Sequence, residues 1–299
     1  MSQAKMSQPA STRRIPLVQR DHRRTFRENL YVYAVVSRRS KGISIGINLN
    51  PDKICNFDCI YCQVDRKTPS VVRAVDMNRL RDELEDMLDL VMSGKLFENE
   101  RFRGTPPELR RLNDIAFSGD GEPTTFPEFF EAVQMAAELK DRRNLSDVKL
   151  VLITNATMFH KPKVREGLAL LRSHNGEMWA KLEAGTEAYF QQIDRTTISF
   201  QRILENITSE AKRSPLVIQA MFLRMRDQPP SEDELAAFCD RLNDIIQAGG
   251  QIKLVQVYTV ARVPAEDYVS PLSRSEVDHI VELVKGRTGL AAEPFYGSD

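Results

Sequence analysis

A regular alternation of strand and helix patterns is the feature that most constrains the fold of this chain. Short apolar runs, typical of buried strands, occupy residues 42–49, 113–117, 148–153, 178–182, 216–222 and 252–260. Apolar residues at helical spacing follow these runs at residues 80–91, 129–139, 164–171, 186–194 with 200–212, 235–246 and 277–284. Such alternation predicts an α/β fold in which right-handed crossovers join parallel strands. Both an open barrel and a doubly wound sheet satisfy this pattern.

The length of the chain favours one folded domain. With 299 residues, 41% of them hydrophobic, the chain has enough apolar surface for a core. Barrels of this size are usually one domain, and no internal repeat or long linker divides the sequence. We therefore expect a flexible basic arm over residues 1–28 and a barrel domain over residues 29–299. Residues 99–111 are expected to form an exposed loop.

Charge is distributed unevenly although the formal net charge is zero. Residues 1–41 hold ten Lys and Arg against Asp21 and Glu28, a net charge of +8 that leaves −8 for the remainder. Such an arm is either a solvated, disordered tail or a contact for RNA phosphates, and both interpretations stay open. A transit peptide is the weaker interpretation, because Pro9 and Pro16 interrupt any amphipathic helix.

The apolar segments are too short to suggest a membrane protein. None approaches the ~18 consecutive residues that a membrane-spanning helix needs. No apolar signal-peptide core follows Met1. We expect a cytoplasmic protein without a membrane partner, in a reducing compartment where thiols remain free.

Three of the four cysteines lie in one short segment. Cys55, Cys59 and Cys62 form a C-x3-C-x2-C run, whereas Cys239 lies in a helical segment and is expected to be a buried thiol. The odd number of cysteines in this segment argues against disulfides, and structural zinc requires four closed ligands. Catalytic zinc with three thiolates is a weaker alternative. Three thiolates suit a four-iron, four-sulfur (4Fe-4S) cluster with one iron left open to a further ligand.

Polar segments follow the first four predicted strands. The cysteine segment follows the first strand, Gly121-Glu122-Pro123 the second, Asn155 the third and Glu183 the fourth. The loops at the carboxyl ends of parallel barrel strands lie on one face. We therefore expect these segments to converge on that face.

With these motifs, the chain resembles the radical SAM enzymes. Their C-x3-C-x-aromatic-C pattern is present, with Tyr61 as the aromatic residue. More narrowly, the chain is similar to the radical SAM group related to the wyosine-base tRNA synthases. The matching segments are residues 36–39, 46–49, 55–62, 117–124, 153–155, 180–185 and 193–195.

The resemblance implies a partial (β/α)6 barrel of the TIM type that binds a 4Fe-4S cluster and S-adenosyl-L-methionine. The three clustered cysteines would hold the cluster. Gly121-Glu122-Pro123 matches the segment that holds the methionine amino group. In this segment Gly121 lets the backbone approach the ligand, and Glu122 complements an ammonium. Asp120 stands where such proteins often have a first glycine.

Further residues are assigned to the site by the same resemblance. Tyr61, Asn155 and Glu183 are predicted to bind the cofactor, the last two near the ribose or the methionine carboxylate. Lys181 and Gln219 lie inside apolar strands, where inward-facing polar side chains need partners. They are expected to face a ligand or to pair with Glu183. Arg195 is expected either to close over the ligand or to form a surface ion pair, and Trp179 to lie in the core.

The implied activity is reductive cleavage of S-adenosylmethionine to a 5′-deoxyadenosyl radical, which removes a hydrogen atom from a substrate. An electron donor such as flavodoxin or ferredoxin would be needed. RNA modification is one hypothesis, but Cys239 alone cannot build the second all-cysteine cluster of the wyosine synthases. The alternative is a non-catalytic iron–sulfur or zinc module that binds RNA through the arm. We expect substrate selection by the arm, residues 99–111 and residues 294–296.

Overall fold

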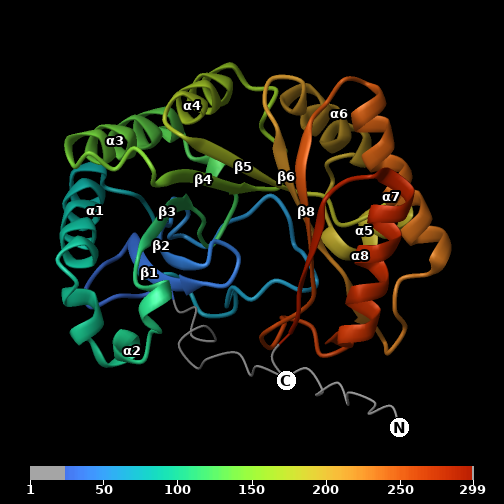
Figure 1. Ribbon diagram of the computed structural model, residues 1–299, viewed down its shortest axis with the longest axis horizontal. Helices are drawn as coiled ribbons and strands as arrows, with labels where there is room; N and C mark the ends of the chain where they lie inside the picture. The colour runs from blue at the N-terminus through green and yellow to red at the C-terminus, as the bar shows by residue number, and fades with distance from the viewer. Residues whose placement is uncertain (1–23, 298–299) are drawn as a thin grey trace, which may run out of the picture.

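An eight-stranded curved sheet forms the centre of the molecule (Figure 1). The computed structural model describes residues 24–297. Across the sheet the order is β1 (Val32–Ser37), β2 (Gly42–Ile47), β3 (Leu112–Phe117), β4 (Lys149–Thr154), β5 (Gly176–Lys181), β6 (Leu216–Met221), β8 (Ile252–Tyr258) and β10 (Ala292–Phe295). Neighbours from β2 to β10 pair in parallel, and β1 is antiparallel to β2.

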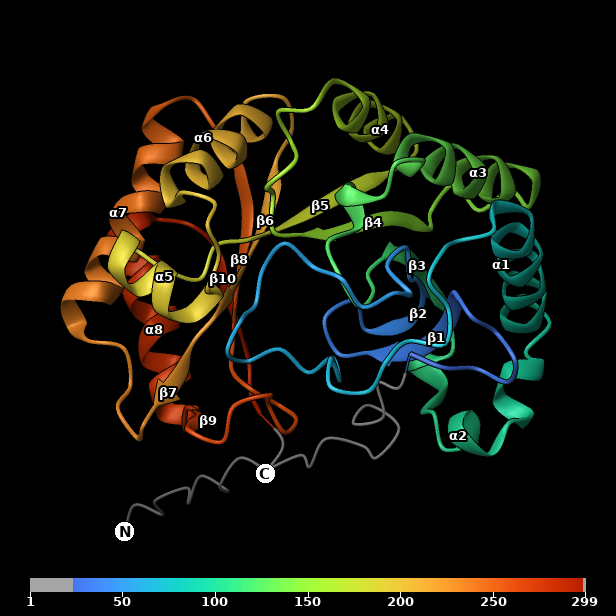
Figure 2. The ribbon, with the colours of Figure 1, turned by 180° about the vertical axis from the view of Figure 1, so that it is seen from behind.

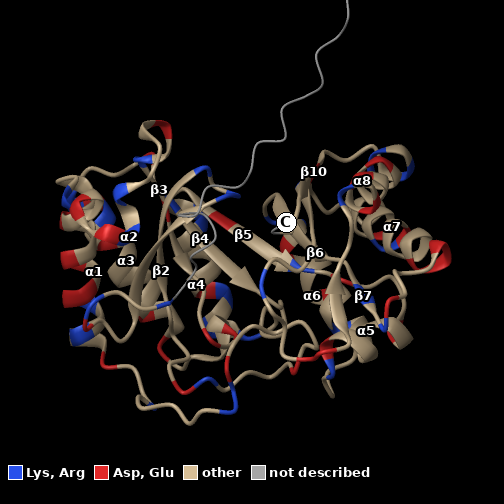
Figure 3. Cartoon of the chain, turned by 90° about the horizontal axis from the view of Figure 1, so that it is seen from below, with Lys and Arg blue, Asp and Glu red and all other residues tan. Residues whose placement is uncertain are grey.

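Helices follow the parallel strands and cover the convex face of the sheet (Figures 1 and 2). They are α1 (Met77–Met92), α3 (Phe129–Arg142), α4 (Pro162–Ser173), α6 (Phe200–Ala211), α7 (Glu232–Gln247) and α8 (Arg274–Thr288), and the short α5 (Glu187–Asp194) precedes α6. This arrangement confirms the predicted α/β fold with a partial (β/α)6 barrel. Acidic and basic residues are interspersed on the outer helices (Figure 3). No helix within residues 24–297 is long and apolar enough to cross a bilayer.

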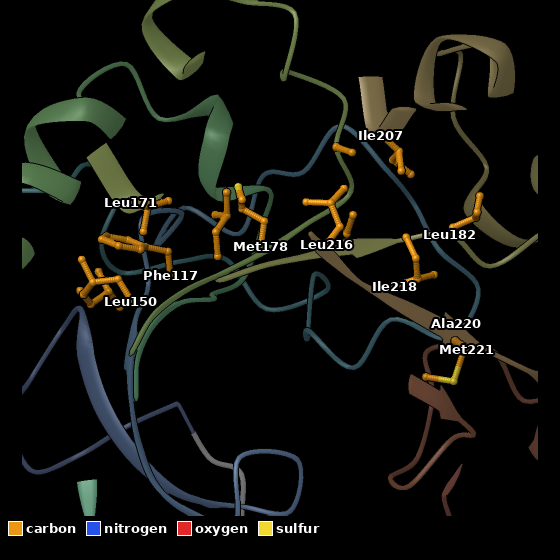
Figure 4. Packing of buried hydrophobic residues seen from close by; sticks show 14 of the residues in the cluster. Phe117, Leu150, Leu171, Met178, Leu182, Ile207, Leu216, Ile218, Ala220 and Met221 are labelled. Carbon is orange, nitrogen blue, oxygen red and sulfur yellow. The ribbon is translucent and has the colours of Figure 1, made fainter. Parts of the chain in front are cut away.

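The main core lies between the sheet and the helices (Figure 4). Phe117 of β3, Leu150 of β4 and Leu171 of α4 are fully buried there. Full burial of such a side chain stabilises the fold by roughly 1.5–3 kcal/mol. Because successive strand side chains point to opposite faces, the alternate residues form a second, smaller cluster, made of Ala116, Val151, Trp179 and Val217. Burial on both faces explains why these strands appear as continuous apolar runs.

Two edge strands were absent from the predicted alternation. β1 joins β2 through a tight turn in which Lys41 has a φ of 58°, so no helix separates the two strands. β10 adds a parallel strand beside β8 and contains Pro294. Proline cannot donate a backbone hydrogen bond to a neighbouring strand and is tolerated at the edge of a sheet. The sequence therefore indicated a tail at residues 294–296 and not a strand.

The structure corrects the prediction for residues 99–111. Residues 99–111 are not wholly an exposed loop, because α2 (Glu100–Arg103) and a 3-10 turn at Pro107–Leu109 lie there and Phe102 is buried. The Phe102 ring lies 6.3 Å from the ring of Phe26, which is also buried. Phe26, within the predicted arm, therefore packs against α2. Residues 1–23 of that arm lie outside the described residues.

Glu83 of α1 holds the start of β1. Its buried carboxylate accepts hydrogen bonds from the backbone N–H groups of Leu30 at 2.9 Å, Tyr31 at 2.8 Å and Val32 at 3.1 Å. Arg79, one helical turn earlier, donates to the same carboxylate at 2.9 Å. Backbone donors that would otherwise be buried without partners are thus satisfied by one side chain.

We expect Glu83→Gln to lower the free energy of unfolding by about 1–3 kcal/mol, because a charged acceptor of backbone hydrogen bonds is lost. Urea denaturation followed by circular dichroism measures the change. Asp82→Asn, an exposed substitution on the same helix, should change it by less than about 0.5 kcal/mol. Equal losses in the two variants would show that Glu83 does not anchor β1.

Candidate functional site

The cysteine segment crosses the concave side of the sheet between β2 and α1 (Figure 2). Its backbone is bound to the end of α5: the N–H of Asp58 donates to the carbonyl of Asp194 at 3.1 Å, and that of Ile60 to the carbonyl of Ile193 at 2.9 Å. Phe57 packs edge-to-face on a phenylalanine of α5, with ring centres 5.8 Å apart. The position of this loop therefore depends on tertiary contacts, since it has no regular secondary structure of its own.

Cys55, Cys59 and Cys62 are free thiols that line one cavity. The buried Cys59 Sγ donates to Asp194 Oδ1 at 3.1 Å, and burial together with the Asp194 charge raises the pKa of Cys59 well above its ordinary value. Metal ligation would displace that proton. Arg66 Nη2 donates to Cys62 Sγ at 3.6 Å. Cys55 Sγ donates to Asn56 Oδ1 at 3.9 Å. Three sulfur donors that line one cavity, each with a polar partner, suit the ligand set of an iron–sulfur cluster.

Glu122 is a buried acceptor at the wall of this cavity. Its carboxylate accepts from Thr154 Oγ1 at 2.7 Å, from the N–H of Asn155 at 2.7 Å, and from the N–H and hydroxyl of Thr124. Burial raises the pKa of Glu122, while these hydrogen bonds oppose the rise. Three of these donors bind Oε1, and the N–H of Asn155 alone binds Oε2. Glu122 therefore supports residues 154–155 and still lines the cavity with an oxygen that can accept a further donor. Contact of Glu122 with an ammonium stays a prediction.

Gly121 is required by the cysteine segment. A Cβ at this position would clash with the backbone carbonyl of Ile54, one residue before Cys55. The close approach predicted for Gly121 therefore involves the protein's own backbone. Pro123 is buried and begins a 3-10 turn at Pro123–Thr125. Asp120, in the place of a first glycine, forms an ion pair with Arg24 at 2.6 Å.

Tyr61 and Glu183 form a buried contact behind the cysteines. The Tyr61 hydroxyl donates to Glu183 Oε2, and the Tyr258 hydroxyl donates to Glu183 Oε1 at 3.1 Å. Asn155 joins the cysteine segment on the other side, where its Nδ2 donates to Asn56 Oδ1 at 2.8 Å. The structure therefore brings the predicted residues of four loops onto one face, at the carboxyl ends of β2, β3, β4 and β5.

The remaining predicted residues divide between cavity and scaffold. Lys181 and Gln219 both line the cavity, and Gln219 also donates to Gln256 Oε1 at 3.0 Å. Arg195 forms surface ion pairs with Asp58 at 3.1 Å and Glu266 at 2.6 Å. Its guanidinium therefore holds the cysteine segment, through Asp58, from the solvent side. Trp179 belongs to the small concave-side cluster and Cys239 is buried in α7, as expected.

Sequence reasoning missed several cationic residues of the cavity. Arg24, Arg66 and Arg262 line it beside the cysteines, and Arg39 lines it from the β1–β2 turn. Arg24 and Arg39 were counted in the basic N-terminal region without a role. No local motif distinguishes these arginines from surface arginines, so only the fold reveals them.

Comparison with known proteins identifies the family. A family model described as the radical SAM superfamily matches residues 49–229. A UPF0026 protein of Helicobacter pylori is 24% identical over 217 residues, covering 71% of this chain and 63% of that protein. A UPF0026 protein of Methanocaldococcus jannaschii is 24% identical over 245 residues, covering 80% of this chain and 66% of that protein. The chain thus spans 63–66% of the length of these relatives.

Solved structures show the same fold. TYW1 with a lysine-pyruvate adduct bound has a TM-score of 0.55 at 13% identity, covering 83% of this chain and 74% of that chain. Streptococcus suis SuiB bound to S-adenosylmethionine has a TM-score of 0.56 at 12% identity, covering 87% of this chain and 52% of that chain. The family match spans more than half of the 299 residues and includes the cysteine segment and the β3, β4 and β5 loops. The chain therefore belongs to the radical SAM superfamily.

Proposed function

We propose that this protein is an enzyme that uses one 4Fe-4S cluster, held by Cys55, Cys59 and Cys62, to cleave S-adenosylmethionine reductively. When bound, the cluster and cofactor supply a 5′-deoxyadenosyl radical that removes a hydrogen atom from the substrate. The observation that carries this proposal is that three free thiols and the loops after β3 and β4 line one cavity. Flavodoxin or ferredoxin is the class of electron donor that we propose.

The chain's own residues position the cofactor and shield it. Asn155 and the backbone of residues 119–121 line the cavity on the β3–β4 side. Glu122 orients Asn155 through its backbone N–H. Tyr61 and Glu183 form the wall behind the cysteines, and the segment around Cys62 is tied across the site by the hydrogen bond from the Ala265 N–H to the Cys62 carbonyl at 2.9 Å. Such fixed walls exclude water and hold reacting groups in place.

The cysteine distribution supports a single cluster. Cys239, the fourth and last cysteine of the chain, is fully buried in α7 and does not line the cavity. A second all-cysteine cluster therefore has no ligands in this sequence. RNA modification remains a hypothesis that rests on the basic arm, most of which lies outside the described residues.

Lys181 is proposed to act as a cation in the cavity. A lysine-pyruvate adduct is bound in the TYW1 structure, and such an adduct forms from a neutral amine. Burial lowers the pKa of Lys181, but the nearby Glu183, Tyr258 and Cys59 raise it by more, so its net pKa lies above the ordinary value. Its ammonium lies 5.4 Å from the centre of the Tyr61 ring. We therefore assign Lys181 to charge complementation.

Cys59→Ala should abolish both the iron–sulfur chromophore and the formation of 5′-deoxyadenosine, because the cluster loses one of three ligands. The test is anaerobic reconstitution with iron and sulfide, followed by dithionite and S-adenosylmethionine. Cys239→Ala is the matched control and should retain both signals. A wild-type protein that carries zinc without a brown chromophore would favour the alternative, a non-catalytic RNA-binding module. A fully loaded wild-type cluster without any 5′-deoxyadenosine would refute the proposed activity.

Glu122→Gln should weaken S-adenosylmethionine binding by about 10- to 100-fold. The amide keeps one acceptor oxygen, so it leaves either the Thr154 hydroxyl or the Asn155 N–H unpaired and shifts the β4 loop. Equilibrium dialysis with labelled S-adenosylmethionine on reconstituted protein measures this directly. Iron content should stay at the wild-type level, which separates cofactor positioning from cluster ligation. The exposed Glu128→Gln serves as a control. Unchanged affinity in Glu122→Gln would exclude the positioning role.

A further inference from the structure

We propose that Arg39 and Arg262 form a binding site for an oxyanion, a carboxylate or a phosphate, of a small-molecule substrate. The site adjoins the three cysteines on the concave side of the sheet. This inference rests on the proposed function, because it places the substrate beside the cofactor cavity.

Two aromatic rings fix the position of Arg39. Its guanidinium carbon lies 5.6 Å from the centre of the Trp179 ring and 5.4 Å from that of the Tyr258 ring. Each ring is itself held, since Trp179 Nε1 donates to Glu177 Oε2 at 2.9 Å and the Tyr258 hydroxyl donates to Glu183 Oε1 at 3.1 Å. A guanidinium that is already oriented loses less entropy when it binds a planar anion.

Neither arginine has an acidic partner in the described part of the chain. No carboxylate oxygen there lies within 4.0 Å of Arg39 or Arg262. By contrast, Arg24 in the same cavity pairs with Asp120 at 2.6 Å. Burial lowers the pKa of Arg39. A bound anion between these cations would offset this cost.

The two arginines connect the cysteine cavity with the interior of the barrel. The cavity that the cysteines line and the adjoining inner cavity share Arg39, Tyr258 and Arg262 as walls. Arg262 is exposed at the rim, and Arg39 is half-buried. The segment after Arg262 is tied to Cys62 through the hydrogen bond of the Ala265 N–H. An anion held by both arginines therefore lies next to the groups assigned to the cofactor.

Asp114 is the acidic residue that lines the inner cavity. The Ser44 hydroxyl donates to its Oδ1, and its buried Oδ2 has no hydrogen-bond partner among the described residues. Burial raises the pKa of Asp114. When protonated, its carboxyl would offer one donor to the same ligand. The unpaired Oδ2 of Asp114 is a second observation, beside the two arginines, that indicates a polar ligand in the inner cavity.

Enclosure favours a small molecule over a nucleic acid. Arg39 contacts two rings and lines the inner cavity. RNA backbones are recognised by basic stripes on exposed faces. A pair of arginines that lines a cavity matches instead the recognition of one carboxylate or phosphate group by a planar fork of donors.

Trp179 is the only tryptophan of the chain and contacts Arg39, so its fluorescence reports on this site. The test uses full-length, cluster-loaded protein titrated with sodium phosphate or sodium succinate, with ionic strength held constant by sodium chloride. We expect a saturable change with at least one anion. Arg39→Gln and Arg262→Gln should each raise the dissociation constant about tenfold or more. Arg202→Gln, an exposed substitution on α6, should leave it unchanged.

Several outcomes would overturn the site. The first is a fluorescence signal that shows no saturable change with either anion, and the second is wild-type anion affinity in Arg262→Gln. The third is complete loss of the fluorescence response when saturating S-adenosylmethionine is present, because the cofactor carboxylate would then be the ligand. A response to a short RNA oligonucleotide but to neither small anion would replace the proposal by an RNA site. Arg262 lies at the rim, so its variant tests the site even if Arg39→Gln fails to fold. Anion binding without any 5′-deoxyadenosine would refute the proposed activity and leave the arginine site standing.

Discussion

The buried carboxylate of Glu122 is the interaction on which the geometry of the site depends. It joins the loop after β3 to the loop after β4, because its acceptor sites are used by Thr124, Thr154 and Asn155. Asn155 then reaches Asn56, beside the first cysteine. A surface ion pair would contribute little to holding these two loops together. A buried carboxylate that accepts from four donors fixes the loops in one conformation. The cysteine loop, which has no regular structure, is therefore held by a rigid frame.

A second set of contacts extends from the cysteines into the barrel. Tyr61 lies between two of the cysteines and donates to Glu183, which also accepts from Tyr258. The Tyr258 ring in turn contacts the guanidinium of Arg39. These neighbours join the proposed cofactor site to the proposed anion site by direct side-chain contact. We therefore expect a substitution at one site to alter ligand binding at the other through these packed side chains.

Much of the fold was predictable because it depends on local patterns. β4 is a continuous apolar run, and α7 repeats its apolar residues at helical spacing, so both were recognised with small errors at their ends. β10 was missed because Pro294 is unfavourable in most strands and is accepted only at an edge. Phe102 was placed in an exposed loop because a helix of one turn has too few residues for a periodic pattern. Its burial depends on Phe26, which is distant in sequence.

Local residue patterns were enough to predict the order of strands and helices, the three thiols of the cysteine segment and the convergence of four loops. Strand periodicity and the single direction of parallel strands are enough for those conclusions. The partner of each polar group is apparent only in the folded chain. Glu122 proved to be an internal acceptor, Gly121 a point of contact with the cysteine segment, and Arg39 a cation held between two rings. Such roles depend on residues far apart in the chain, and no local spacing encodes them.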